Sequence, residues 1–203
     1  MPLASDIEPV AQGISLWSVY DPAVKADLFS TAVATVSGIF LIDPVLLAPG
    51  ALASLRAQGK IAGIIVTNDN HLRGAAGFSD QFEVPIFLHA GVTAIATPRV
   101  QRIGNRERFA PGLTAIEIEG GPPGEIAVYS EAANGTLVIG DALINFEPYG
   151  FALLPAKYCA SARAMRRSLP KLLDYSFQRI LFAHGTPILR DARHRLEQLL
   201  VER

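Results

Sequence analysis

The chain has little cysteine and no dominant charge. A single cysteine, Cys159, occurs among its 203 residues. One cysteine excludes an internal disulfide framework and any cysteine-rich zinc site, and it is consistent with a reducing compartment. The 18 basic and 19 acidic residues give a net charge of -1, and no long run of one sign occurs. This balance argues against nucleic acid or an anionic membrane as a partner.

Long apolar runs are also absent. No stretch approaches the ~20 apolar residues of a membrane-spanning helix. The first residues carry acids and prolines, whereas a signal peptide has a basic start and an apolar core. The sequence therefore predicts a soluble, cytoplasmic protein. Half of the residues are hydrophobic, which is enough for a large core. We interpret residues 1–203 as one domain, because no low-complexity segment or linker divides them.

Hydrophobic periodicity predicts the order of elements in the first half. Alternating or β-branched segments predict three successive strands, and a region in which helices and strands alternate follows. The predicted strands are residues 13–20, 28–36, 38–42, 61–66 and 85–89, and the predicted helices are residues 49–58 and 75–82.

The second half repeats this order. Short strands are predicted at residues 100–103, 113–118, 125–130 and 136–139. A helical stretch at 161–175 broken by Pro170, a strand at 179–183 and an amphipathic helix at 189–201 follow. Two halves of this kind predict two mixed sheets packed face to face with helices outside.

Polar residues with chemical capability follow four of the predicted strands. They are Asp43, the segment TNDNHLR at residues 67–73, Asp141 and His184. Loops that leave strand ends commonly carry functional sites, because the rigid scaffold aims side chains from distant positions at one point. We therefore expect these residues to form one pocket.

Five short motifs occur in a fixed order along the chain: LIDP at 41–44, TNDNHLR at 67–73, GGPPGE at 120–125, GDAL at 140–143 and HG at 184–185. On these motifs the chain resembles the metallo-beta-lactamase superfamily over roughly residues 13–190. The resemblance implies a four-layer αββα sandwich of the α/β (α+β) class.

The resemblance also indicates where the metal ligands of a dinuclear site would fall. These places are Asn68, Asn70, Leu72, Arg73, Gly121, Asp141 and His184. Only Asp141 and His184 are good metal ligands, because amide oxygens bind zinc weakly, leucine and glycine offer no donor, and arginine repels a cation. We therefore expect no bound metal or other cofactor, and no functional di-zinc hydrolase. The first interpretation is a pseudo-hydrolase that binds a small molecule or a partner.

The predicted pocket contains Asp43, Asn68, Asp69, Asn70, His71, Arg73, Gly121, Asp141 and His184. We expect the Arg73 guanidinium to neutralise Asp141 and to attract an anionic small-molecule ligand. Asp43 is interpreted either as a residue that fixes the ligand loop or as a turn residue before Pro44. Neither nucleic acid nor a membrane is an expected partner, and the sequence leaves the oligomeric state open.

Asp69 and His71 support a second hypothesis, which leaves enzymatic activity open. With a one-residue shift of their loop, they would join Asp141 and His184 in a single-metal site for zinc, iron or manganese. The protein would then be a metal-dependent hydrolase of an ester, thioester or lactone, with Asp141 and His184 as catalytic residues. The alternative for Asp69 and His71 is hydrogen bonding within the loop.

Residues 146–155 are aromatic and apolar, and the resemblance places them beside the cleft. Three interpretations stay open for this segment: the wall of a small-molecule pocket, an oligomer contact, or part of the monomer core.

Overall fold

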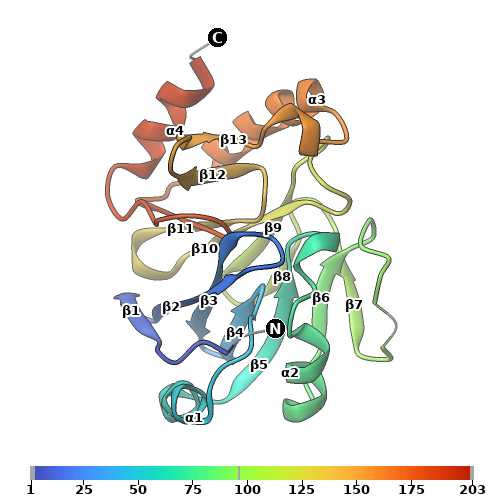
Figure 1. The fold of residues 1–203 in the computed structure, drawn as a ribbon, viewed down its shortest axis with the longest axis vertical. Coiled ribbons are helices and arrows are strands. Elements are labelled where there is room, and N and C mark those ends of the chain that lie inside the picture. Colours follow the sequence, from blue (N-terminus) through green and yellow to red (C-terminus); the bar gives the residue numbers. More distant parts are fainter. Residues whose placement is uncertain (1–2, 96, 202–203) are drawn as a thin grey trace.

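The computed structural model describes residues 3–95 and 97–201, and its strands form two large sheets and a separate hairpin (Figure 1). The first sheet contains seven strands in chain order. They are β1 (Glu8–Ala11), β2 (Ile14–Asp21), β3 (Ala26–Thr35), β4 (Gly38–Ile42), β5 (Ile61–Val66), β6 (Ile86–His89) and β7 (Val100–Ile103). Strands β1 to β4 are antiparallel, whereas β4 to β7 are parallel. Helices α1 (Pro49–Gln58) and α2 (Ala75–Phe82) provide two of the parallel crossovers.

The second sheet has the strand order β14-β11-β10-β9-β8. Its members are β8 (Arg108–Ala110), β9 (Leu113–Glu117), β10 (Ile126–Ser130), β11 (Thr136–Ile139) and β14 (Arg179–Phe182). The hairpin consists of β12 (Leu143–Phe146) and β13 (Gly150–Leu153). The remaining helical elements are η1 (Asp69–His71), η2 (Ala132–Asn134), η3 (Ala156–Tyr158), α3 (Ala162–Ser168), η4 (Leu169–Asp174) and α4 (Ala192–Val201).

Three hydrophobic clusters fill the three spaces of a four-layer sandwich. Leu55 of α1, Phe78 of α2 and Ile64 of β5 belong to the cluster that packs the first helical layer on the first sheet. The next residue, Ile65, points to the opposite face and belongs to the cluster between the two sheets. A third cluster packs α3, η4 and α4 on the second sheet. The predicted αββα architecture is therefore confirmed.

The predicted elements agree with the structure apart from short or terminal segments. The helix predicted at 161–175 is α3 followed by the 3-10 helix η4, which contains Pro170, and α4 begins at Ala192, where residue 189 had been predicted. Strands β1, β8, β12 and β13 were not predicted. They are three or four residues long. No helix in the described part of the chain is long and apolar enough to cross a membrane.

The parallel strand pairs determine where the polar loops meet. In the first sheet β4 and β5 run in the same direction, and in the second sheet β11 and β14 do so. Backbone hydrogen bonds join the two sheets at the ends of these strands. The Phe29 N–H donates to the Ala183 carbonyl at 3.0 Å, and the Ile126 N–H donates to the Thr67 carbonyl at 2.8 Å. The loops after β4, β5, β11 and β14 are thereby brought to one edge of the sandwich.

Candidate functional site

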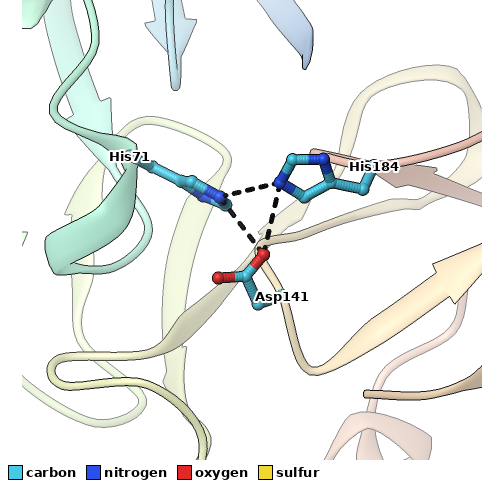
Figure 2. A group of neighbouring side chains, drawn as sticks. All are labelled: His71, Asp141 and His184. Carbon is cyan, nitrogen blue, oxygen red and sulfur yellow. Dashed lines mark hydrogen bonds and ion pairs between the residues drawn. The ribbon is translucent and has the colours of Figure 1, made fainter. Parts of the chain in front are cut away.

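Three side chains from three of these loops converge on one point (Figure 2). The Nε2 atom of His71 lies 3.2 Å from Oδ1 of Asp141, and Nε2 of His184 lies 3.4 Å from the same oxygen. The two Nε2 atoms are 3.3 Å apart. Within the described residues, these three are the group of histidine, cysteine and acidic side chains able to hold a metal ion. Their donor atoms form a nearly equilateral triangle.

The size of this triangle matches a tetrahedral metal site. Ligands bound about 2.0–2.1 Å from a tetrahedral zinc ion are roughly 3.3 Å from one another, and the three observed separations lie within 0.1 Å of that value. Two histidines and one carboxylate are also a ligand set used by catalytic zinc sites and by non-haem Fe(II) sites, both of which leave coordination positions open.

The other ring nitrogen of each histidine already has an oxygen partner. Nδ1 of His71 lies 3.0 Å from Oδ2 of Asp43 and 2.9 Å from Oγ1 of Thr67. Nδ1 of His184 lies 3.3 Å from the carbonyl oxygen of Asp27. A carbonyl only accepts, so the His184 ring carries its proton on Nδ1 and directs the Nε2 lone pair into the triangle. Partners of this kind fix the tautomer and orientation of metal-binding histidines.

The two oxygens of the Asp141 carboxylate have different partners. Oδ1 faces the two imidazoles, whereas Oδ2 accepts hydrogen bonds from the side-chain amides of Asn68 at 3.1 Å and Asn70 at 3.2 Å. The side-chain oxygen of Asn68 in turn accepts from the backbone N–H of Asn70 at 2.9 Å. The two asparagines of the TNDNHLR segment therefore hold the carboxylate with one oxygen presented to the histidines.

Glu125, which follows the Gly-rich loop, is a further site residue that was not among the predicted ones. Its Oε2 accepts from the amide of Asn68 at 2.6 Å, and its Oε1 accepts from the backbone N–H groups of Asp141 and Ala142 at 2.9 Å. A Cβ atom added to Gly121 would lie 2.8 Å from Cγ of Glu125. The Glu125 side chain thus packs directly against Gly121. The signal for it was an acidic residue in GGPPGE immediately before an apolar strand.

Electrostatics favour a charged His71 between two carboxylates. Burial and the nearby Arg73 charge lower the pKa of His71, but Asp141 and Asp43 outweigh them and raise the pKa to about 9. Burial alone would raise the pKa of both aspartates. The charge and hydrogen bond of His71 reverse this effect, so that the pKa of Asp43 is lowered and that of Asp141 falls well below its usual range.

His184 and Glu125 shift in the opposite sense. Burial, reinforced by the charge of His71, lowers the pKa of His184 to about 4. Burial and the Asp141 charge raise the pKa of Glu125 to about 8. At neutral pH the metal-free site therefore holds a protonated His71, a neutral His184 and a neutral Glu125. The proton on Nε2 of His71 then lies on the side of the ring that faces Asp141 and His184.

The prediction that Arg73 pairs with Asp141 is wrong. The largely buried guanidinium donates to three backbone carbonyls, those of Phe29 at 2.5 Å, Asp43 at 3.1 Å and Ala183 at 3.5 Å. It connects strand β3 with the ends of β4 and β14. The ion-pair partners of Asp141 are His71 and His184, and Arg73 acts on it only through the field of its charge.

The structure separates Asp69 from His71. Oδ1 of Asp69 accepts from the backbone N–H groups of Thr93 at 3.1 Å and Ala94 at 3.2 Å, so Asp69 bonds a neighbouring loop and lies outside the triangle. The alternative four-residue metal set is therefore reduced to His71, Asp141 and His184. No shift of the loop is needed, because His71 ends the 3-10 turn η1 with its ring buried in the site.

Asp43 combines both of its predicted roles. Its Oδ1 accepts from the Thr67 backbone N–H at 2.8 Å, and its Oδ2 accepts from the Thr67 hydroxyl at 2.5 Å. These bonds fix the start of the loop that carries His71. Asp43 also lies in the bend before Pro44 with a positive φ of 49°, a conformation that is uncommon for residues other than glycine.

The comparisons with known proteins agree with this architecture. The family model described as the metallo-beta-lactamase superfamily matches residues 11–202, and the chain belongs to this superfamily. No curated protein matches it.

Solved structures are similar over nearly the whole chain. The DIM-1 metallo-beta-lactamase is 14% identical, with 98% of this chain and 97% of that chain covered and a TM-score of 0.77. A metallo-beta-lactamase from Pontibacter korlensis is 14% identical, with 98% and 99% covered and a TM-score of 0.75. TTHA1623 in a di-iron-bound form is 23% identical, with 84% and 92% covered and a TM-score of 0.61. At these identities the likeness establishes the fold alone.

Proposed function

We propose that this protein is a metal-dependent hydrolase whose centre holds one ion between His71, Asp141 and His184. One observation carries the proposal: three donor atoms lie 3.2–3.4 Å apart, and both histidines have their Nδ1 atoms committed to oxygen partners. A zinc or iron ion bound there would supply Lewis acidity, which lowers the pKa of water and polarises an ester, thioester or lactone carbonyl.

The residues fit one metal and not two. In the family's dinuclear arrangement Asn68 and Asn70 stand at ligand places, yet here their amide N–H groups point at Asp141. The Asn68 amide also donates to Glu125. The amide hydrogens of Asn68 and Asn70 therefore occupy the carboxylate oxygens that a second ion would otherwise coordinate. The chemistry of the site therefore differs from that of a di-zinc hydrolase.

The charges around the triangle accommodate a divalent ion. Asp43 and Asp141 contribute two negative charges, and Arg73 contributes one positive charge. An ion that takes the place of the His71 proton adds one net positive charge. Glu125 offers compensation, because its carboxyl group has a pKa of about 8 and lies one amide away from Asp141. A proton lost from Glu125 would restore neutrality.

The open side of the site indicates where a substrate approaches. His71 and Asn68 are buried, whereas Asn70 is exposed and His184 is partly exposed. A carbonyl group reaching the triangle would pass these two residues. The exposed amide of Asn70 spends one N–H on Asp141 and has a second N–H for a substrate oxygen.

A second candidate function is a metal-free binding protein. It is favoured by the completeness of the hydrogen bonding, since every buried side-chain nitrogen and oxygen of the described residues has a partner without an ion. In this case the His71 proton holds the triangle together, and the protein binds its ligand without turnover.

Metal content per chain distinguishes the two candidates. Tag-free protein purified without chelator would be offered zinc, iron and manganese, dialysed and measured by inductively coupled plasma mass spectrometry. We expect about one ion per chain in the wild type and its loss in Asp141→Asn and His71→Gln. His194→Gln, at an exposed histidine of α4, is the matched control and should keep the ion. No stoichiometric ion under any condition would reject the hydrolase and leave the metal-free candidate.

A further inference from the structure

Glu125 is a buried acid that reaches the site from the end of the Gly-rich loop. Its backbone carbonyl accepts from the Ile118 N–H at 2.9 Å. The N–H of the next residue, Ile126, donates to the Thr67 carbonyl at 2.8 Å, and Asn68 follows Thr67 directly. The backbone of Glu125 is therefore fixed beside the loop that carries Asn68.

Two glycines leave the room that the Glu125 side chain occupies. A Cβ atom on Gly121 would lie 2.8 Å from Cγ of Glu125, and a Cβ atom on Gly140 would lie 2.9 Å from its Oε1. Both separations are shorter than ordinary contacts of a Cβ atom. Because these positions lack side chains, the carboxyl group of Glu125 reaches the loop after β5 and the loop after β11 at the same time.

The side-chain amide of Asn68 has one orientation that satisfies its partners. Its oxygen accepts from the Asn70 N–H at 2.9 Å, and its nitrogen donates to Oε2 of Glu125 at 2.6 Å and to Oδ2 of Asp141 at 3.1 Å. A reversed amide would turn its oxygen towards two acceptors and its NH2 group towards a donor. Oε2 of Glu125 accepts whether or not the carboxyl group carries a proton. Glu125 therefore favours the orientation in which Asn68 donates to Asp141.

Glu125 also holds the backbone of Asp141. Its Oε1 accepts from the N–H groups of Asp141 and Ala142, both at 2.9 Å. One carboxyl group thus acts on Asp141 twice, directly at the main chain and through Asn68 at Oδ2. The other carboxylate oxygen of Asp141, Oδ1, faces His71 at 3.2 Å and His184 at 3.4 Å.

We infer that Glu125 is a positioning residue of the proposed metal centre, which directs Oδ1 of Asp141 towards the two imidazoles. This inference rests on the proposed function and assigns a role to a residue outside the triangle. Glu125 acts through Asn68 and the backbone, and it contributes no atom to the triangle of His71, Asp141 and His184. Residues that orient a metal ligand in this way typically contribute about 10–100-fold to metal affinity.

Two substitutions of Glu125 separate position from charge. In Glu125→Gln the oxygen still accepts from the backbone of Asp141, but the NH2 group faces the NH2 group of Asn68. Glu125→Asp keeps a carboxyl group and is one methylene shorter, so it does not span both partners. We expect zinc affinity, measured by competition with a chromophoric chelator, to fall at least about tenfold in both variants. Glu131→Gln, at an exposed acid that pairs with Arg108, is the control and should bind zinc like the wild type.

Wild-type affinity in both variants would overturn the inference. A loss in Glu125→Gln with wild-type affinity in Glu125→Asp would also overturn it, because the effect would then come from charge and not from position.

The metal-free protein provides a measurement that does not depend on zinc. In chelator-treated protein, nuclear magnetic resonance would follow solvent exchange of the Asn68 side-chain NH2 group, which is buried and donates to Glu125 and Asp141. We expect slow exchange in the wild type and exchange at least about tenfold faster in Glu125→Gln. Fast exchange in the wild type, or equal rates in the two proteins, would overturn the inference. If the wild type binds no zinc, the proposed hydrolase fails, and the exchange rates alone decide whether Glu125 holds Asn68.

Discussion

Asp43 holds His71 in place through Oδ2 and Nδ1, which are 3.0 Å apart in the interior of the protein. The same carboxylate binds the backbone N–H and hydroxyl of Thr67, so the position of the His71 ring is fixed from the β4 side of the site. Nε2 of His71 is thereby left facing Asp141 and His184. This relationship connects the end of strand β4 to the triangle of His71, Asp141 and His184 through a single imidazole.

Replacing Asp43 by asparagine tests this connection. The amide in Asp43→Asn no longer compensates the charge of His71 and does not fix its tautomer. We expect metal affinity to fall about 10–100-fold, the usual effect of losing a residue that orients a ligand. Competition with a chromophoric chelator would measure the affinity. The exposed carboxylate of Asp80 on α2 provides the control, and Asp80→Asn should leave the affinity unchanged. Equal affinities for both variants would contradict the role of Asp43.

Much of the fold could be predicted from the sequence because the periodic segments are long. Strand β5 at Ile61–Val66 and helix α2 at Ala75–Phe82 agree with the prediction to the residue. The hairpin β12–β13 was missed. Its strands have four residues each and lie outside both large sheets, with a bridge from Asn145 to Gly185 beside their mutual pairing. Their sequences therefore carry little of the alternation that marks a strand.

The candidate site was predicted only in part. The residues of the pocket were identified from strand ends, but His71 was expected to need a shifted loop, and Arg73 was expected to pair with Asp141. The conformation of η1, which buries the His71 ring, depends on Asn68 capping its first turn at the Asn70 N–H. The direction of Arg73 depends on three carbonyls from β3, β4 and β14. The first is a local side-chain cap and the second is a tertiary effect, and the spacing of residues in the sequence encodes neither.

Arg73 is predicted to be essential for stability. In Arg73→Met the three carbonyls that it serves lose a charged donor, and Asp43 loses a nearby positive charge. The carbonyls of Asp43 and Ala183 keep the Ser30 hydroxyl and the Phe29 N–H as donors. We expect a loss of roughly 2–3 kcal/mol in the free energy of unfolding, because hydrogen bonds from charged groups contribute about 1.5–3 kcal/mol. Urea denaturation would measure it. Arg108→Met breaks an exposed ion pair with Glu131 and should cost at most about 1 kcal/mol. Similar losses in both variants would refute the role of Arg73.

Metal binding should release a proton. At pH 7.5 the metal-free His71 is charged, because its pKa is about 9, whereas His184 is already neutral with a pKa of about 4. An ion can bind Nε2 of His71 only after that proton leaves. Calorimetric titrations with zinc in HEPES and in Tris, whose ionisation enthalpies differ, would give the number of protons released. We expect about one or more at pH 7.5 and progressively fewer as the pH approaches 9. No release at pH 7.5 would place the metal elsewhere.

The stability of the metal-free protein should fall as the pH rises above neutrality. Folding raises the pKa of His71 from 6.5 to about 9 and that of Glu125 from 4.5 to about 8. A raised pKa means that the folded state keeps a proton that the unfolded chain releases. The His71 contribution is therefore complete below pH 6.5 and lost towards pH 9, and the Glu125 contribution is lost between pH 4.5 and pH 8.

Below pH 6.5 a third group changes the trend. Folding lowers the pKa of His184 from 6.5 to about 4, so its contribution grows as the pH rises from 4 to 6.5 and offsets that of Glu125. Chelator-treated protein should thus be about equally stable between pH 5 and 6.5 in urea denaturation. From pH 6.5 to 8 the free energy of unfolding should fall by about 1.4 kcal/mol per pH unit for each of His71 and Glu125. Glu125→Gln should halve this slope. A free energy that rises with pH across this window would show that His71 is neutral, and the imidazolium between Asp43 and Asp141 would have to be abandoned.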